Sequence, residues 1–259
     1  MSKLPGIKLF DMSGKTTIIT GGSKGLGLAM AEAIASAGGN VFLVSRTQEE
    51  CDSAAQKIEE AYGTKAKGYA TDVTDQTKTE AMAKACIDSF GSIDVLINSA
   101  GINIRGAIDE LSLNDFKKVM DINVTGTWLA SRAVTPQMKK QKSGKIINLA
   151  STLGVVGLAN RTPYTASKGA VVNMTKALAL ELSPFNINVN AICPGPFLTE
   201  MNEPIADTEE AKNFIVGATS LGRWGKLEEI QGAALFLSSA ASNYMVGTIM
   251  PVDGGWVAK

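Results

Sequence analysis

The chain has 259 residues, 45% of them hydrophobic, and its 25 basic residues balance its 25 acidic residues. This length fits one large α/β domain, and the balanced charge argues against a nucleic-acid or membrane partner. The absence of histidine excludes Ser-His-Asp hydrolysis, HExxH metalloproteases and the usual zinc dehydrogenase site. No apolar stretch approaches a membrane span of about 20 residues, and residues 1–15 lack the apolar core of a signal peptide, so we expect a cytoplasmic protein.

Strand-like runs alternate with helical runs along the chain. The strand-like runs cover residues 16–20, 40–45, 65–70, 93–98, 145–151, 187–193 and 247–252. Such alternation, with strands rich in Val and Ile, predicts a parallel sheet with helices on both faces. Right-handed crossovers then bring the carboxyl ends of the strands to one edge. We expect residues 1–13 to be a loosely attached leader, and residues 194–220 to be either a mobile lid or an ordinary surface excursion.

The first strand runs directly into a glycine-rich loop. The loop contains Gly21, Ser23, Lys24, Gly25, Leu26 and Gly27, and a helical run follows. The glycines allow a tight turn and a close backbone approach to a pyrophosphate, and the helix N-terminus supplies amide donors for the anion. The spacing GxxxGxG differs from GxGxxG, and a glycine loop can be only a turn. Its place between a strand and a helix nevertheless favours dinucleotide binding.

The residues after the second strand favour a phosphorylated dinucleotide. An NAD site places an acid about 20 residues after the glycine loop, where it holds the ribose 2′-hydroxyl. This chain has Ser45 and Arg46 there, with no acid between Val44 and Gln48, and Lys24 adds a second cation. Since a guanidinium can bind a 2′-phosphate through two parallel hydrogen bonds, we predict NADP(H) as the cofactor.

Tyr164 and Lys168 lie four residues apart in a helical run, 13 residues after Ser151. The spacing puts both side chains on one helix face, where an ammonium beside the phenol would lower the tyrosine pKa toward neutral pH. Ser151 can add a hydrogen-bond donor where charge develops on a substrate oxygen. The three residue types suit proton transfer at a carbinol or carbonyl oxygen, although a tyrosine with a lysine four residues later is common in helices.

Together the motifs resemble the short-chain dehydrogenase/reductase family over essentially the whole chain. The matching segments are TGGSKGLG at 20–27, INSAG at 97–101, DINVTG at 121–126, INLASTLG at 147–154, YTASK at 164–168, CPGPFLTEM at 193–201 and VDGG at 252–255. Ser99 replaces the second asparagine of the family's NNAG segment, and because serine is small and polar we expect the turn to survive. The resemblance implies one doubly wound Rossmann domain over residues 1–259, with a seven-stranded parallel sheet and helices on both faces.

The resemblance also implies a reaction, which is hydride transfer between nicotinamide and a secondary alcohol or ketone, without a metal. In this reaction Tyr164 is the acid or base, Ser151 orients the substrate oxygen, and Lys168 lowers the tyrosine pKa and binds the nicotinamide ribose. Asn123 holds a water that carries the proton onward. The implied cofactor-binding residues are Gly21, Ser23, Lys24, Gly25, Leu26, Gly27, Ser45, Arg46, Asp72, Val73, Asn98, Ala100, Gly101, Tyr164, Lys168, Pro194, Gly195 and Thr199.

The substrate is less well defined. Residues 223–239 and VDGG resemble gluconate 5-dehydrogenase-like and other sugar or polyol dehydrogenases, but 3-oxoacyl-[acyl-carrier-protein] reductases share much of this pattern. We expect a sugar acid or polyol, and the residues expected to contact it are Arg105, Ser151, Leu153 and Tyr164, with Asn103, Ile104, Asn160, Arg161 and Met201 near the pocket mouth. An acyl-carrier reductase and a non-catalytic NADP(H)-binding sensor remain alternatives. The resemblance further implies a homotetramer.

Overall fold

The seven predicted strands form one sheet in the computed structural model, which describes residues 6–200, 202–209 and 211–258. The strands are β1 (Thr16–Thr20), β2 (Asn40–Ser45), β3 (Ala66–Ala70), β4 (Val95–Asn98), β5 (Gly144–Leu149), β6 (Ile187–Pro194) and β7 (Ile249–Val252). Their order is β3-β2-β1-β4-β5-β6-β7, and every neighbouring pair is parallel. This arrangement confirms the predicted doubly wound fold.

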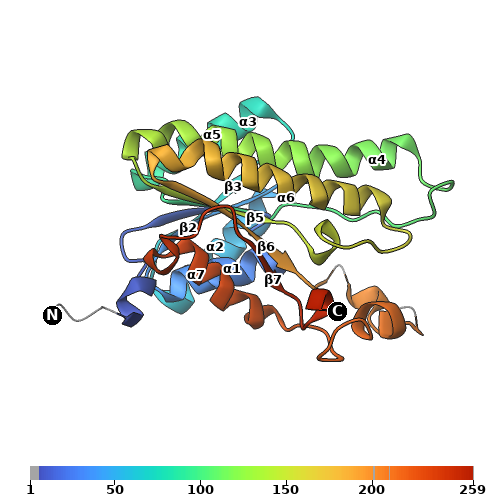
Figure 1. The fold of residues 1–259 in the computed structure, drawn as a ribbon. Helices are drawn as coiled ribbons and strands as arrows, with labels where there is room; N and C mark the ends of the chain where they lie inside the picture. The colour runs from blue at the N-terminus through green and yellow to red at the C-terminus, as the bar shows by residue number, and fades with distance from the viewer. Residues whose placement is uncertain (1–5, 201, 210, 259) are drawn as a thin grey trace.

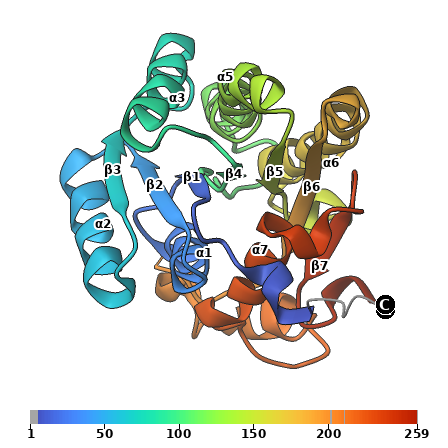
Figure 2. The same cartoon turned by 90° about the vertical axis from the view of Figure 1, so that its left-hand side faces the viewer.

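Helices cover both faces of the sheet (Figure 1 and Figure 2). One face carries α1 (Gly25–Ser36), α2 (Gln48–Tyr62) and α7 (Gln231–Ser238), and the other carries α3 (Gln76–Phe90), α5 (Gly126–Gln141) and α6 (Thr162–Leu182). A shorter helix, α4 (Leu113–Met120), packs against α6. It leads into α5 through a π-helical turn at Asp121–Thr125. None of the helices in the described residues is long and apolar enough to cross a membrane.

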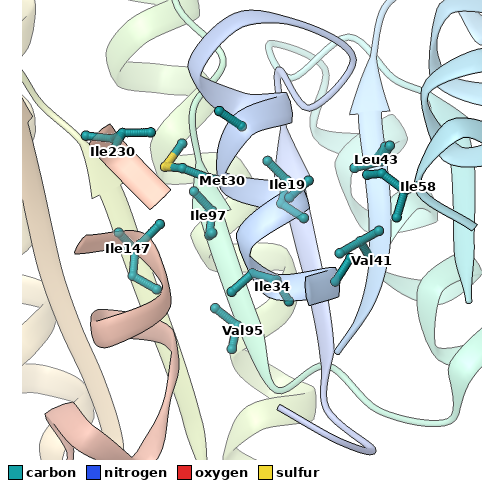
Figure 3. Packing of buried hydrophobic residues seen from close by; sticks show 14 of the residues in the cluster. Ile19, Met30, Ile34, Val41, Leu43, Ile58, Val95, Ile97, Ile147 and Ile230 are labelled. Atoms are coloured by element: carbon teal, nitrogen blue, oxygen red, sulfur yellow. The ribbon is translucent and has the colours of Figure 1, made fainter. Parts of the chain in front are cut away.

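The strands divide their side chains between two apolar cores. In β2, Val41 and Leu43 belong to the core beneath α1, whereas Phe42 and Val44 belong to the core beneath α3 and α5, and all four are fully buried. The alternation follows from the two-residue period of a strand. It explains why these strands read as continuous apolar runs in the sequence. Figure 3 shows the first core, where Met30 of α1 lies against the sheet.

The N-terminal segment is attached to the domain from Phe10 onward. A short 3-10 helix covers Gly6–Phe10, and the ring of Phe10 lies 6.3 Å from the ring of Phe236 in α7, measured between centroids. Met12 is only 1% exposed and belongs to the core beneath α1. The expected loose attachment therefore does not describe Phe10 and Met12, because burial of their apolar surface holds them against the domain.

Residues 194–220, the expected lid, lie where the chain leaves the carboxyl end of β6. They contain short helical turns at Glu203–Ile205 and Ala211–Val216. The buried Phe197 pairs with Gly225 in an isolated parallel bridge, so the start of the segment is held to the domain. Figure 1 shows this orange segment beyond the carboxyl edge of the sheet.

Candidate active site

A cavity of about 1180 Å³ opens at the carboxyl edge of the sheet. The glycine loop, the ends of β2 and β5, the turns after β3 and β4, the start of α6 and the chain after β6 all contribute to its walls. Most of the expected cofactor-binding residues line it, namely Gly21, Ser23, Lys24, Gly25, Leu26, Gly27, Ser45, Arg46, Asp72, Val73, Ala100, Gly101, Tyr164, Lys168, Pro194, Gly195 and Thr199. The parallel topology thus brings residues that are distant in sequence to one space.

The glycine loop is shaped for close backbone contact. Gly21 has a φ of +65°, and a Cβ there would lie 2.9 Å from the backbone nitrogen of Ala100. A Cβ on Gly27 would overlap the carbonyl oxygen of Gly21. Lys24 stands at the N-cap of α1 without a side-chain cap bond, so the first amide groups of the helix keep their capacity to bind an anion.

Thr20, which sequence reasoning missed, holds the turn after β4. Its Oγ1 accepts hydrogen bonds from the backbone nitrogens of Ser99 and Ala100, both at 3.2 Å. The turn at Ser99 is therefore held through backbone atoms. It persists with serine in place of asparagine, as we expected. A threonine at the end of β1, immediately before the glycine loop, was the available sequence signal.

Asn98 was expected to contact the cofactor, but it does not line the cavity. Its side chain is buried between β4 and α5, where Nδ2 donates to Oδ1 of Asn148 at 2.9 Å and to Oγ of Ser131 at 3.0 Å. Asn148 in turn donates to Oγ1 of Thr175 in α6 at 2.9 Å. Because alternate strand residues face opposite sides, the last residue of β4 points into the layer of α5 and α6. This buried network connects the strands to the two helices that carry the site.

Ser151, Tyr164 and Lys168 line the cavity on the side of β5 and α6. Ser151 follows β5 and is 7% exposed; its Oγ accepts a hydrogen bond from the backbone nitrogen of Leu153 at 3.1 Å, and it lies near enough to the Tyr164 phenol to draw the tyrosine pKa down. Lys168 lies one turn further along α6, with Nζ 5.6 Å from the centroid of the Tyr164 ring. The same Nζ donates to the carbonyl oxygen of Leu149 at 2.6 Å.

Burial dominates the pKa values of this group. It raises the pKa of the Tyr164 phenol above its usual value, against the opposing effects of the nearby Ser151 hydroxyl and of the charge of Arg105. Burial also lowers the pKa of Lys168 to about 8. The expected lowering of the tyrosine pKa is therefore not found, because burial outweighs the influences that lower it. A tyrosine with a raised pKa keeps its proton at neutral pH and can donate it to a carbonyl oxygen.

Asn123 lies behind the cavity wall, in the π-helical turn between α4 and α5. Its fully buried side chain accepts from the backbone nitrogen of Ile102 at 2.8 Å, and it donates to the carbonyl oxygen of Ile102 and to Oγ of Ser167, both at 3.0 Å. A Cβ on Gly101 would lie 3.2 Å from Asn123 Oδ1 and 3.6 Å from Lys168 Nζ. The asparagine therefore fixes the loop after β4 close to the lysine, and its water-holding role stays a prediction.

The expected substrate residues lie at different depths. Nη2 of Arg105 donates to Oδ1 of Asn202 at 3.1 Å, and Asn202 lines the cavity whereas Arg105 does not. Leu153 is buried beside Ser151 and is also absent from the cavity wall. Arg105 nevertheless lies close enough to lower the pKa of Tyr164.

The loop that carries Arg105 is held near the start of α6. The carbonyl oxygen of Asn160 accepts hydrogen bonds from the backbone nitrogen of Gly106 at 3.2 Å and from Nη1 of Arg161 at 2.9 Å. Arg161 is buried, with 4% of its surface exposed. Neither Asn160 nor Arg161 lines the cavity, and their bonds support the loop instead. Asn103 and Ile104 belong to the same loop, and Met201 lies outside the described residues.

Arg46, Asp72 and Glu50 line the cavity on the side of β2 and β3, with β1 and β4 between them and β5. Asp72 Oδ1 accepts from the backbone nitrogen and Oγ1 of Thr74, at 3.0 and 2.7 Å, and these bonds hold its pKa below the usual value, with a smaller contribution from Arg46. Oγ of Ser23 donates to Oε2 of Glu50 at 3.4 Å. Glu50 is a second residue that sequence reasoning missed, and its place in the first turn of a helix that follows β2 was the available signal.

Known proteins resemble this chain in both sequence and fold. The family model described as short chain dehydrogenase matches residues 15–210. Gluconate 5-dehydrogenase from Gluconobacter oxydans (strain 621H) is 40% identical over 247 residues, which cover 95% of this chain and 96% of that protein. 3-Oxoacyl-[acyl-carrier-protein] reductase from Thermotoga maritima is 35% identical over 246 residues, which cover 95% of this chain and 99% of that protein.

A solved structure agrees with these relatives. The gluconate 5-dehydrogenase from Burkholderia cenocepacia J2315, in complex with NADP and tartrate, has a TM-score of 0.94 and 32% identity, with coverage of 98% of this chain and 99% of that chain. The agreement extends over nearly the full length of both chains. This chain belongs to the short-chain dehydrogenase family.

Proposed function

We propose that this protein is an NADP(H)-dependent oxidoreductase that transfers a hydride between nicotinamide and a secondary alcohol or ketone, with a sugar acid as the favoured substrate. The observation that carries the proposal is a cavity lined by the glycine loop and Arg46, which follows β2, and also by Ser151, Tyr164 and Lys168, which lie beyond β1 and β4, after β5 and in α6. A dinucleotide placed along the cavity would bring its two ends to these two groups.

The shape of the cavity fits a dinucleotide. Gly21 and Gly27 leave no room for side chains where the loop meets its neighbours, and the uncapped start of α1 offers amide groups to a pyrophosphate. Arg46 can bind a 2′-phosphate, and Lys168 and Tyr164 border the end where nicotinamide would lie. When bound, the nicotinamide supplies or accepts the hydride.

The chain's own residues handle the proton. Tyr164, which burial keeps protonated at neutral pH, donates to the substrate oxygen during reduction and accepts the proton back during oxidation. The Ser151 hydroxyl lies close enough to the phenol to lower its pKa, and it orients the same oxygen. Lys168 keeps a positive charge below a pH of about 8, so it can stabilise negative charge that develops on Tyr164. Asn123 positions the loop beside Lys168, where a water can carry the proton onward.

We favour a sugar acid as the substrate. The relative from Gluconobacter oxydans and the structure from Burkholderia cenocepacia are both named gluconate 5-dehydrogenases, and the second was solved with NADP and the dicarboxylate tartrate. In this chain Asn202 lines the cavity and accepts a hydrogen bond from Arg105. The positive charge of Arg105 therefore lies directly behind a residue of the cavity wall. Its charge would favour a carboxylate over a neutral group at that position.

The proposed assembly is a homotetramer in the cytoplasm. Exposed apolar side chains support a contact through α5 and α6, since Trp128 is 46% exposed and Leu180 is 75% exposed. Sedimentation of the purified protein would test the assembly, and a monomer at micromolar concentration would contradict it.

A substrate panel tests the function. Keto-sugar acids, polyols, neutral cyclic ketones and acetoacetyl thioesters are offered with NADPH or NADP+, and the fastest turnover is expected with a sugar acid. Arg105→Ala removes the positive charge behind Asn202, so it should raise KM for the keto-sugar acid more than it raises KM for a neutral ketone. Faster turnover of an acetoacetyl thioester than of every sugar or polyol would support the acyl-carrier reductase instead.

A further inference from the structure

The end of the cavity that holds Arg46 carries an acid as well as cations. Glu50 lines this end together with Ser23, Lys24 and Arg46. Its Oε2 accepts a hydrogen bond from the Ser23 hydroxyl at 3.4 Å. Within the described part of the chain no ion pair neutralises Glu50 or Arg46, whereas Lys24 lies 3.9 Å from Glu200. A ligand at this end therefore meets a carboxylate and a guanidinium that do not neutralise each other.

The position of Glu50 follows from where α2 begins. The helix starts at Gln48, directly after β2, so Glu49 and Glu50 both lie in its first turn. An acid in the first turn stabilises a helix through the helix dipole, and this effect applies equally to both residues. Of the two, Glu50 lines the cavity and contacts the glycine loop. Helix stabilisation therefore does not explain why Glu50, unlike Glu49, lies in the cavity and contacts the glycine loop.

This inference rests on the proposed function. We propose that Glu50 is a specificity-determining residue that limits the preference for the 2′-phosphorylated dinucleotide and allows the protein to use NAD(H) as well. A phosphate near Glu50 is repelled by the carboxylate, whereas a ribose 2′-hydroxyl can donate a hydrogen bond to it. Arg46 acts in the opposite direction, because it attracts the phosphate. The balance between Glu50 and Arg46 then sets the ratio of the two cofactors.

Nucleotide fragments test this balance without a turnover measurement. Adenosine 2′,5′-bisphosphate carries the 2′-phosphate and adenosine 5′-monophosphate lacks it, so the ratio of their dissociation constants isolates the contribution of that group. Calorimetry at low ionic strength would compare the unmodified protein with Glu50→Gln and with the matched control Glu49→Gln. Both variants lose one negative charge from the same helical turn.

Glu50→Gln should tighten binding of the bisphosphate roughly five- to tenfold, the size of one partly screened charge repulsion, and should change binding of the monophosphate by less than about twofold. Glu49→Gln should leave the ratio unchanged. The gain should shrink as salt is added, because exposed charges are screened. The ratio of kcat/KM for NADPH to that for NADH should rise in the same variant.

Two results would overturn the inference about Glu50 but leave the proposed function intact. The first is an equal change in the ratio for Glu50→Gln and Glu49→Gln, which would indicate a general effect of net charge. The second is an unchanged ratio in Glu50→Gln while both fragments still bind. Failure of both fragments to bind any of the three proteins would instead contradict the proposed dinucleotide cavity, and the inference with it.

Discussion

Lys168 is bonded through Nζ to the carbonyl oxygen of Leu149, the last residue of β5, at 2.6 Å. Leu149 lies two residues before Ser151, so this bond ties the helix that carries Tyr164 to the strand that leads to Ser151. The lysine is 6% exposed, which leaves it little access to water. One side chain therefore links the element that carries the proton donor to the one that carries the orienting hydroxyl, and it holds its ammonium 5.6 Å from the centroid of the Tyr164 ring.

Replacing Tyr164 with phenylalanine tests its role in proton transfer. Tyr164→Phe keeps the ring and removes the proton, so kcat should fall by about 10² to 10⁴ while nucleotide binding persists. Tyr244→Phe is the matched control, because Tyr244 is fully exposed outside the cavity and should keep normal turnover. Near-normal kcat in Tyr164→Phe would contradict the assignment.

Replacing Arg46 tests the cofactor preference. Arg46→Asp exchanges an attractive charge for a repulsive one at the end of β2, so NADP(H) should bind at least about tenfold more weakly. Binding of NAD(H) should change much less, which narrows or reverses the preference. Fluorescence titration of both reduced cofactors measures the two changes. An equal loss of affinity for both cofactors would show that Arg46 acts on the fold of the loop and not on the 2′-phosphate.

Lys145 predicts a pH dependence of stability. Its Nζ donates to Oγ of Ser242 at 3.0 Å, and burial lowers its pKa from 10.5 to about 8. The folded state thus disfavours the charged form, and this penalty is complete below pH 8 and disappears as the pH rises toward 10.5. Lys145→Met should raise the melting temperature most below about pH 8, and the gain should diminish as the pH approaches about 10.

A control for Lys145 is available on another strand. Lys67 of β3 is exposed and its Nζ likewise donates to a serine, Oγ of Ser89, at 2.9 Å. Lys67→Met removes the same charge and the same kind of bond without relieving a burial penalty. Its melting temperature should show no comparable gain between about pH 7 and pH 10. Parallel pH profiles for the two variants would exclude the burial of Lys145 as the cause.

Alanine substitutions at two helical glycines distinguish the effect of close packing from the effect of helix propensity. Gly27→Ala would force a Cβ against the carbonyl oxygen of Gly21, so either the loop or α1 must move, and nucleotide binding should be lost together with about 2 kcal/mol or more of stability. Gly232 lies in α7, where an added Cβ would meet no atom within 4 Å, and Gly232→Ala should be neutral or stabilising by up to about 1 kcal/mol. Chemical denaturation and nucleotide titration measure both effects. Retained binding in Gly27→Ala would contradict the tight fit.

The fold was largely predictable because burial on both faces makes each strand a continuous apolar run between turns. Residues 16–20 and 40–45 match β1 and β2. The predicted strand at 93–98 begins two residues too early. There the backbone nitrogen and carbonyl oxygen of Ile93 bond to the side chain of Gln141, and the pairing with β1 starts at Val95. Residue pattern alone does not reveal such a side-chain bond.

The site was predictable as a set of segments, but not in its detailed orientation. Asn98 ends a strand at the right edge of the sheet, yet the pleat turns its side chain toward α5. The π-helical turn at Asn123 depends on bonds to Ile102 and Ser167, which are 21 and 44 residues away. The pKa of Tyr164 depends on burial, which the spacing to Lys168 does not encode. These features arise from tertiary contacts.

Thr20 has a consequence for how the chain can vary. Its hydroxyl holds the turn after β4 through the backbone nitrogens of residues 99 and 100, and every residue except proline has such a nitrogen with a hydrogen to donate. Holding the turn in this way makes no demand on the side chain at position 99, whereas it requires a hydroxyl at position 20.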